Sequence, residues 1–413
     1  MTKTSRVRTV EPNRSQVTIT WGVAEDTLPA EHPARVLWAI TSRLDLSRFL
    51  VGAKAVQGHA GRPTLSPQVK LVLWLYAVSQ GIGSAREIER RTRCETAFRW
   101  IVGERTVCHD TLSTFRAQQG GAFDQLLSDV LGTLVHQGVL SLELVALDGM
   151  RVRAAASAPS FRSAAALQEC REQAALHVKA VLAQGDDPER SRAQKAARQA
   201  AARDFQRRID EAIATVEKIT QQPDPPLRPR ASTTDAEARV MKMADGGFRP
   251  AYNVQLATAG SAMGGPRTIV GLRVTNVGSD MSSVPPLLDD IERRTGKRPN
   301  AILADANHAS HAGIREATGR GVQAIIAVPE RSQKVGRHSD TDDAINAWRE
   351  RMTTDEAQRI YRARASLCEL SNAHFRRRGL QQFLVRGLGN VGNVVLMVAL
   401  ATNLLQHAPA LLA

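Results

Sequence analysis

Two short apolar runs, far apart along the chain, are each followed by an aspartate. Leu142–Leu147 (LELVAL) leads into Asp148, and Asn300–Ala304 leads into Asp305. Short apolar runs bounded by polar or turn residues are typical of buried strands. Side chains just past the strand ends of an α/β sheet line a common site. The sequence therefore predicts an α/β fold in which the two aspartates approach each other.

The rest of the chain after residue 235 alternates between strand and helix patterns. Further strands are expected at Ala251–Thr258, Thr268–Thr275 and Gln323–Val328, and helices at Ser282–Arg294, Ala309–Ala317, Thr354–Phe383 and Val391–Leu405. The last of these is apolar but is interrupted by Asn393, Thr402 and Asn403. It is too short and too polar to span a bilayer, so we expect a buried helix.

Two other regions are predicted to be wholly helical. Residues 161–220 are alanine-rich, charged and almost free of glycine, which predicts one or two long helices, and Pro223–Arg230 reads as a linker. Between Gly61 and Gln119, Ser66-Pro67 and Ser84–Glu87 have the pattern of helix starts, and a third helix begins near Asp110. Three short helices fit a helix-turn-helix module. A small bundle with solvated arginines fits the pattern almost as well.

The charge balance favours a polyanionic partner. The chain has 413 residues, with 55 Lys and Arg against 41 Asp and Glu, a net charge of +14 and a pI near 10.3. Nucleic acid and an acidic membrane surface are both compatible with this excess. The N-terminus lacks the apolar core of a signal peptide, so we expect a cytoplasmic protein that binds nucleic acid and no membrane. The four cysteines have neither disulfide nor zinc spacing.

A third carboxylate, Glu369, lies in the basic helix near the C-terminus. Residues seven apart share a helix face, so Arg362, Glu369 and Arg376 project the same way. Carboxylates are the ligands that Mg²⁺ prefers, and a pair of metal ions stabilises the attacking and leaving oxygens of phosphodiester cleavage. Taken singly, each residue is also explained by structure, as a turn or cap aspartate or a surface ion pair.

Several longer motifs occur in a particular order. They are GRPTLSPQVKLVLWLYAVSQGIGSAREIERR (Gly61–Arg91), LDGMRVRAAAS (Leu147–Ser157), ARVMKMADGGFRPAYNVQLAT (Ala238–Thr258), ILADANHAS (Ile302–Ser310) and YRARASLCELSNAHFRRRGLQQFLVRGL (Tyr361–Leu388). Over residues 60–405 the chain resembles the DDE transposases encoded by bacterial insertion sequences. The resemblance implies an α/β fold with a ribonuclease-H-like mixed-sheet core, an N-terminal helical domain and a helical insertion. The expected domains are an N-terminal segment (1–60), a helical DNA-binding domain (61–140), the catalytic core (141–160 and 236–413) and the insertion with its linker (161–235).

The resemblance also implies roles for particular residues. Asp148, Asp305 and Glu369 would form the catalytic triad and bind Mg²⁺, for which Mn²⁺ could substitute. Contacts to DNA are expected from the arginines of the first basic helix and from the family's tyrosine and basic positions, namely Arg86, Arg90, Arg91, Tyr361, Arg364 and Arg376.

The implied function is a transposase that binds terminal inverted repeats, cleaves DNA strands and joins them to a target. Its partners would be double-stranded DNA, both element ends and target, and a second copy of the chain in the DNA complex. The alternatives are a nuclease of the same fold and a catalytically inactive DNA-binding relative. Two neighbouring residues are assigned structural roles, Asp280 as a helix N-cap and His308 as a solvent-facing residue at a helix start.

Overall fold

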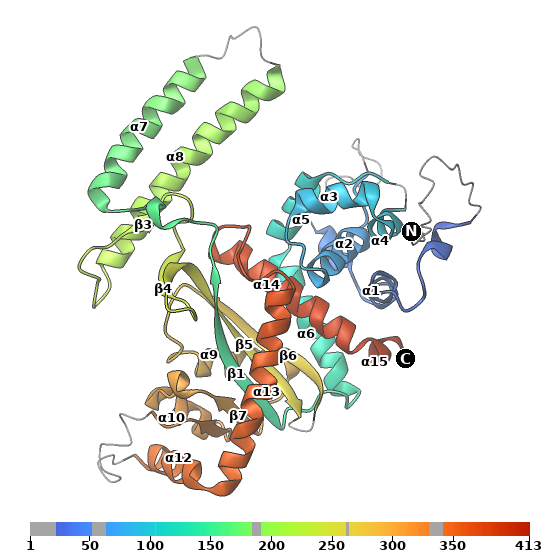
Figure 1. Ribbon diagram of the computed structural model, residues 1–413, viewed down its shortest axis with the longest axis vertical. Helices are drawn as coiled ribbons and strands as arrows, with labels where there is room; N and C mark the ends of the chain where they lie inside the picture. Colours follow the sequence, from blue (N-terminus) through green and yellow to red (C-terminus); the bar gives the residue numbers. More distant parts are fainter. Residues whose placement is uncertain (1–21, 52–62, 104, 184–190, 262–263, 330–341) are drawn as a thin grey trace, which may run out of the picture.

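The computed structural model describes residues 22–51, 63–103, 105–183, 191–261, 264–329 and 342–413. A mixed β-sheet lies at the centre, a helical domain packs beside it, and a two-helix arm projects away from both (Figure 1). The predicted α/β class and ribonuclease-H-like core are confirmed.

The central sheet contains both parallel and antiparallel pairs. Its order is β6-β5-β1-β7-β8, with β4 pairing the first residues of β5. Strand β5 runs antiparallel to its neighbours β1 and β6, while β1, β7 and β8 are parallel. The strands are β1 (Leu144–Arg153), β4 (Arg239–Lys242), β5 (Phe248–Ser261), β6 (Gly264–Thr275), β7 (Ala301–Ala304) and β8 (Gln323–Ile326).

Strand β1 is longer than the apolar run that predicted it. We expected the strand to end at Leu147, but it continues to Arg153, so Asp148 lies inside it. The reason is its antiparallel neighbour, because β5 pairs with β1 all the way from Val145 to Arg153. The parallel neighbour β7 pairs with β1 only as far as Ala146. Asp148 therefore lies where β1 passes the end of β7.

In the residues that the structure describes, the N-terminal helical domain consists of helices α1 to α6. Helix α2 is its centre, since every residue from Lys70 to Val78 is buried, and the indole of Trp74 donates a 3.0 Å hydrogen bond to the carbonyl of Leu112 in α5. Helix α1 packs on α2, so part of the predicted N-terminal segment belongs to this unit. The helices are α1 (Pro33–Thr41), α2 (Pro67–Ser79), α3 (Ala85–Cys94), α4 (Thr96–Val102), α5 (His109–Gln118) and α6 (Gly120–His136).

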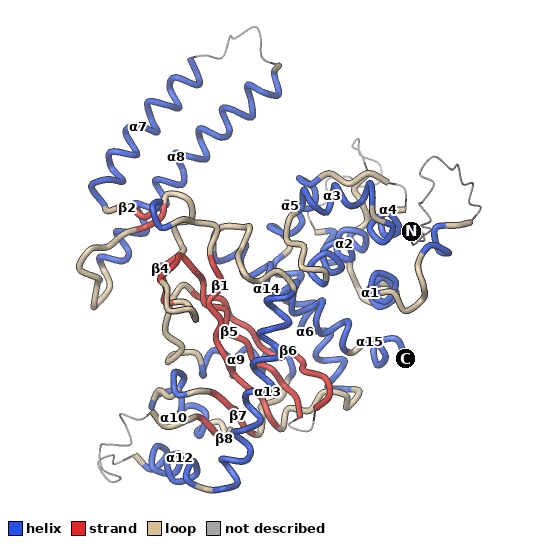
Figure 2. The backbone as a smooth tube through the Cα atoms, in the orientation of Figure 1, coloured by secondary structure: helices blue, strands red, loops and turns tan. Residues whose placement is uncertain are grey.

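The arm consists of two antiparallel helices, as the alanine-rich composition predicted (Figure 2). They are α7 (Ala164–Ala183) and α8 (Arg192–Thr220), and the short strands β2 (Phe161–Arg162) and β3 (Ala231–Ser232) pair at their base. An apolar cluster at this base is separate from the main core. It contains Leu167, Ala212, Val216, Ala231 and Ala236.

Helices cover both faces of the sheet. Leu367 of α13 lies against Gly260 on one face, and Ile291 of α9 lies against Gly271 on the other. The C-terminal helices are α9 (Val284–Thr295), α10 (His311–Gly319), α12 (Asp343–Thr353), α13 (Asp355–Arg377), α14 (Leu388–Gln406) and α15 (Ala408–Leu412).

Helix α14 is buried, as predicted, in spite of its polar residues. The side chain of Asn403 accepts from the N–H and donates to the C=O of Ile269, and Asn393 donates to two carbonyls at the end of α5. Among the described residues, α14 is the one helix long and apolar enough to cross a membrane, but 67% of its apolar window is buried inside the fold. Its polar groups are satisfied by the protein, which explains how they are tolerated.

The helical domain and the core touch through two glycines. Gly81 follows α2 with φ +77°, and Gly379 ends α13 with φ +93°. A Cβ on Gly379 would lie 2.9 Å from the carbonyl oxygen of Gly81, and a Cβ on Gly81 would lie 2.9 Å from that of Arg377. Both the backbone conformation and the close approach therefore require glycine at these positions.

Candidate active site

The sheet register brings Asp148 and Asp305 side by side. Ala146 of β1 pairs with Leu303 of β7, so two residues further on Asp148 and Asp305 occupy matching positions. Neighbouring strands lie about 4.8 Å apart. The two aspartates interact electrostatically: besides burial, the negative charge of Asp305 contributes to raising the pKa of Asp148.

Asp148 is held by burial and by helix α13. Burial is the main cause that raises the pKa of its carboxyl, and the positive charge of Arg364 acts in the opposite direction. The amide of Asn372 donates a 2.6 Å hydrogen bond to its Oδ2 atom. The thiol of Cys368, one helical turn earlier, lies 3.8 Å from the carbonyl oxygen of Leu147. Helix α13 therefore lies directly over the Asp148 position of β1.

Asp305 is held by the turn that follows it. Its Oδ1 atom accepts hydrogen bonds from the backbone N–H of Asn307 and from Nδ1 of His308, each 2.9 Å long. Burial alone would raise the pKa of Asp305, but the hydrogen bond and charge of His308, the Asn307 N–H and Arg364 outweigh it and lower the pKa. The pKa values of the two neighbouring aspartates are thus shifted in opposite directions.

Glu369 lies on a different face of α13 from the residues that meet the sheet. Arg364, Cys368 and Asn372 follow one another at four-residue spacing on the inner face. Glu369 is exposed, together with Arg362 and Arg376. Its side chain makes no hydrogen bond or ion pair within the described part of the chain.

The structure therefore brings together two of the three predicted catalytic carboxylates. The ligand atoms of Asp148, Asp305 and Glu369 do not all lie within 4.8 Å of one another. The Asp148–Asp305 pair nevertheless fits a hard divalent cation. Two adjacent carboxylates supply oxygen ligands, and a cation would offset both the burial and the repulsion by Asp305 that raise the pKa of Asp148.

Two family models match the chain. A transposase domain (DUF772) matches residues 23–118, which include α1 to α5, and a transposase DDE domain matches residues 329–408, which include α12, α13 and α14. Both matches support an insertion-sequence DDE transposase. No curated protein and no solved structure matches it. The second match includes Glu369, Arg364 and Asn372, so the family's DDE segment supplies the helix that covers the aspartate pair.

In this transposase His308 is not solvent-facing, which corrects the prediction. Only 1% of its side chain is exposed, because the 3₁₀ turn Ala306–His308 folds the ring back onto Asp305. Its Nε2 atom is buried without a hydrogen-bond partner among the described residues. A histidine three residues after a strand-end aspartate gives little sequence signal, because its burial depends on how the turn packs.

Asp280 is not the N-cap of α9, which is Ser283. The carboxylate of Asp280 is buried, pairs with Arg151 at 2.9 Å and accepts a 2.6 Å hydrogen bond from Asn253. It lies against Gly149, on the face of β1 opposite to Asp148, because successive strand residues point to opposite faces. Asp280 thus contacts β1 and β5 on the face opposite to Asp148 and is not part of the aspartate pair.

The predicted DNA-contacting arginines of α3 are partly neutralised by their own helix. Arg90 and Arg91 both bind Glu87, and Arg91 also binds Glu95. Hydrogen bonds from Arg90 and Arg91 lower the pKa of Glu87 to about 2. Arg86 is exposed and has no ion pair with any residue that the structure describes. The ion pairs of Arg90 and Arg91 are those expected of a helical bundle whose arginines face solvent, which is the alternative to a helix-turn-helix module.

The predicted DNA contacts of α13 divide between the site and the surface. The guanidinium of Arg364 lies 5.8 Å from the ring centroid of Tyr361 and close enough to both aspartates to act on their pKa values. Arg376 is exposed one turn after Asn372. Asn372 and Cys368 were missed from the sequence, although their spacing from Arg364 on a single helix face could have indicated them.

Proposed function

We propose that this transposase binds the terminal inverted repeats of its element as double-stranded DNA, cleaves DNA strands and transfers them to a target. The observation that supports the chemistry best is the proximity of Asp148, in β1, to Asp305, which directly follows the adjacent parallel strand β7. The helix of the DDE segment lies over the pair and adds Arg364. The net charge of +14 supports a polyanionic partner.

The residues that would hold Mg²⁺, or Mn²⁺ in its place, are Asp148, Asp305 and Glu369. When bound, the metal would stabilise negative charge on the attacking and leaving oxygens of a phosphodiester. Glu369 is exposed and held by no other described side chain, so its carboxylate is free to turn toward the pair and toward DNA. Its membership of the triad is part of this proposal.

The surrounding side chains have distinct tasks in this proposal. Asn372 donates to Oδ2 of Asp148 and His308 hydrogen-bonds Oδ1 of Asp305, so the surrounding side chains hold both carboxylates in place. Arg364 adds positive charge beside the pair, where a phosphate would approach. Tyr361 supports that guanidinium with its ring, and Arg376 contacts the DNA backbone from the exposed face.

The proposal extends to assembly and domain roles. Residues 61–140 bind DNA, residues 141–160 and 236–413 perform the chemistry, and residues 161–235 form the arm. Because two element ends must be joined, two copies of the chain would act together on DNA in the cytoplasm, at the nucleoid. In α3, Arg86 is the best placed for a DNA phosphate, because Arg90 and Arg91 are engaged by Glu87.

One observation favours a second function. The ligand atoms of Asp148, Asp305 and Glu369 do not all lie within 4.8 Å of one another, and a transposase-derived DNA-binding protein without catalysis would need no preformed metal site. A nuclease that cuts without joining is the remaining alternative within the same fold.

The decisive experiment compares wild type with Asp148→Ala, Asp305→Ala and Glu369→Gln on DNA that contains the element's own ends, with Mg²⁺ and a plasmid target. We expect each variant to bind DNA but to lose cleavage on the order of 100-fold or more. Glu356→Gln, an exposed glutamate in the first turn of the same helix, is the matched control and should cleave normally.

The outcomes separate the alternatives. If wild type binds without cutting in Mg²⁺ or Mn²⁺, the DNA-binding protein is the better account. If it cuts but yields no joined product, it is a nuclease. If Glu369→Gln cleaves like Glu356→Gln, Glu369 is not the third carboxylate.

A further inference from the structure

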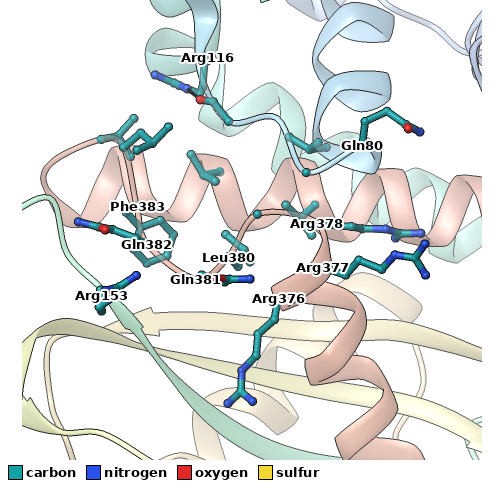
Figure 3. Close-up of a pocket in the computed structure, with 18 residues that line it drawn as sticks. Gln80, Arg116, Arg153, Arg376, Arg377, Arg378, Leu380, Gln381, Gln382 and Phe383 are labelled. Carbon is teal, nitrogen blue, oxygen red and sulfur yellow. Dashed lines mark hydrogen bonds between the residues drawn. The ribbon is translucent and has the colours of Figure 1, made fainter. Parts of the chain in front are cut away.

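Five arginines line a cavity between the helical domain and the core (Figure 3). They are Arg116, Arg153, Arg376, Arg377 and Arg378. The cavity has a volume of about 470 Å³ and is also lined by the polypeptide that follows α2 and by the loop that follows α13. Arg116 comes from α5, Arg153 from the end of β1 and the other three from the end of α13. The cavity is therefore built jointly by both parts of the protein.

The positive charge of this cavity is not compensated within the described chain. No aspartate or glutamate lines it, and none of the five arginines forms an ion pair with a described carboxylate. Elsewhere arginines do find such partners, for example Arg91 with Glu87 and Glu95 in α3. The surface of the cavity is thus electrostatically suited to an anion.

Two of the arginines are partly buried and fixed in place. Burial lowers the pKa of Arg116 to about 10, and its guanidinium lies 4.6 Å from the ring centroid of Trp74 and donates a 2.9 Å hydrogen bond to the carbonyl of Gly83. Burial and the charge of Arg377 lower the pKa of Arg378, which donates to the hydroxyl of Thr402. Holding unpaired cations together away from water is unfavourable, and a bound anion offsets this cost.

The same two elements that position the aspartate pair also lead to the cavity. Along β1, Asp148 and Arg153 are five residues apart, which corresponds to about 17 Å. Along α13, Arg376 follows Asn372 by one turn, or about 6 Å. A single DNA strand advances about 3.4 Å per phosphate along its helix axis. The cavity is therefore a few nucleotides away from the aspartates.

We propose that this cavity binds backbone phosphates of the DNA strand whose reacting phosphate lies at Asp148 and Asp305. The new contacts are Arg116, Arg153, Arg377 and Arg378, in addition to Arg376. The inference rests on the proposed function in requiring DNA as the partner. Because Arg116 belongs to the helical domain and the others to the core, a bound strand bridges the two and fixes the DNA against the site.

The test measures equilibrium binding of a duplex of about 40 base pairs that contains an element end, in EDTA and over about 50 to 200 mM NaCl. Arg153→Gln and Arg377→Gln change exposed side chains, so the fold should be retained. Each should weaken binding about 5- to 20-fold and reduce the slope of log K against log salt by about 0.9. Arg377→Lys should recover most of the loss, since a lysine still contacts a phosphate as a point charge.

The matched control is Arg298→Gln, which removes the same charge from an exposed arginine paired with Glu292. It should change binding less than 2-fold. Equal losses in the control and the cavity variants would overturn the proposal, and so would inorganic phosphate binding to the cavity with no effect of the variants on DNA.

Because binding is measured in EDTA, without metal, the result for the cavity does not depend on whether the protein cleaves DNA. If the cavity variants lose binding while wild type never cuts, the cavity stands and the enzymatic function fails. If wild type cuts and the cavity variants bind and cut equally well, the cavity proposal fails alone.

Discussion

Packing, rather than backbone conformation, requires a glycine at position 149. Gly149 lies within β1, and a Cβ there would lie 2.5 Å from Oδ1 of Asp280 and 3.1 Å from Oδ1 of Asn253. Asp280 is itself held by Arg151 at 2.9 Å. Asp148 can occupy one face of the strand because its neighbour Gly149 leaves room for the Asp280–Arg151 ion pair on the other face.

We predict that Gly149→Ala lowers the free energy of unfolding by about 1–3 kcal/mol, because the added methyl group displaces a buried carboxylate. Gly132→Ala is the control, since Gly132 lies inside α6 with no atom within 4 Å of a Cβ. It should raise stability by up to about 1 kcal/mol. Urea unfolding of both variants measures the difference, and equal effects would contradict the packing argument.

At the aspartate pair, the residues that could be predicted from the sequence are those marked by a local sequence pattern. Asp148 and Asp305 could be found because each follows an apolar run. Asn372 and His308 could not, because their roles depend on how α13 and a 3₁₀ turn pack against the strands. The predicted shared face of Arg362, Glu369 and Arg376 agrees with their common exposure, but only packing shows that the inner face of α13 is a different one.

Among the secondary-structure elements, helices α6 and α9 are joined by a charged cluster. Arg294 of α9 has only 2% of its side chain exposed, and it binds Asp124 of α6 and Asp290 of its own helix. Arg293 binds the same two aspartates. Burial alone would raise the pKa of Asp124, but hydrogen bonds and charge from the two arginines outweigh it and lower the pKa.

This cluster should make the free energy of unfolding depend on pH in the acidic range. Because the folded pKa of Asp124 is below its unfolded value, its ionised form stabilises the fold above about pH 4 and this contribution is lost as pH falls through the folded pKa. Asp124→Asn should therefore cost about 1–2 kcal/mol at pH 7 and less at pH 3. Thermal unfolding from pH 3 to 7 tests this, and a cost independent of pH would exclude the electrostatic explanation.

The boundaries of a helix or strand could be predicted where they depend on a local sequence pattern. They were missed where they depend on pairing with another strand. Helices α9 and α14 begin and end within about three residues of their predicted limits, as expected for periodic segments. The overrun of β1 to Arg153 depends on pairing with β5, which no local pattern reveals. The two-residue strands β2 and β3 are too short to have a period, and α12 was not predicted.

On the scale of the whole molecule, the arm is an attachment with its own small core (Figure 1). Helix α8 has 29 residues, a length of about 43 Å. The cluster that holds the arm together includes Leu167 and Ala212, which lie near its base. The arm beyond this cluster adds little to the stability of the sheet.

We predict that replacing residues 172–207 with a short Gly-Ser linker leaves the fold intact. The deletion removes the outer parts of α7 and α8 and keeps Leu167, Ala212 and Val216 of the cluster at the base. The midpoint of thermal unfolding should change by less than about 4 °C, as calorimetry can measure. A fall of more than about 10 °C would show that the arm supports the core.

The contact between Gly81 and Gly379 bears on how such a protein can be assembled from parts during evolution. Separate family models match the two segments that meet there, as expected of exchangeable modules. Yet neither backbone leaves space for a side chain on the other, so a mutation at one glycine has no simple compensation at its partner. A recombinant that joined this helical domain to a foreign catalytic module would have to inherit both glycines together.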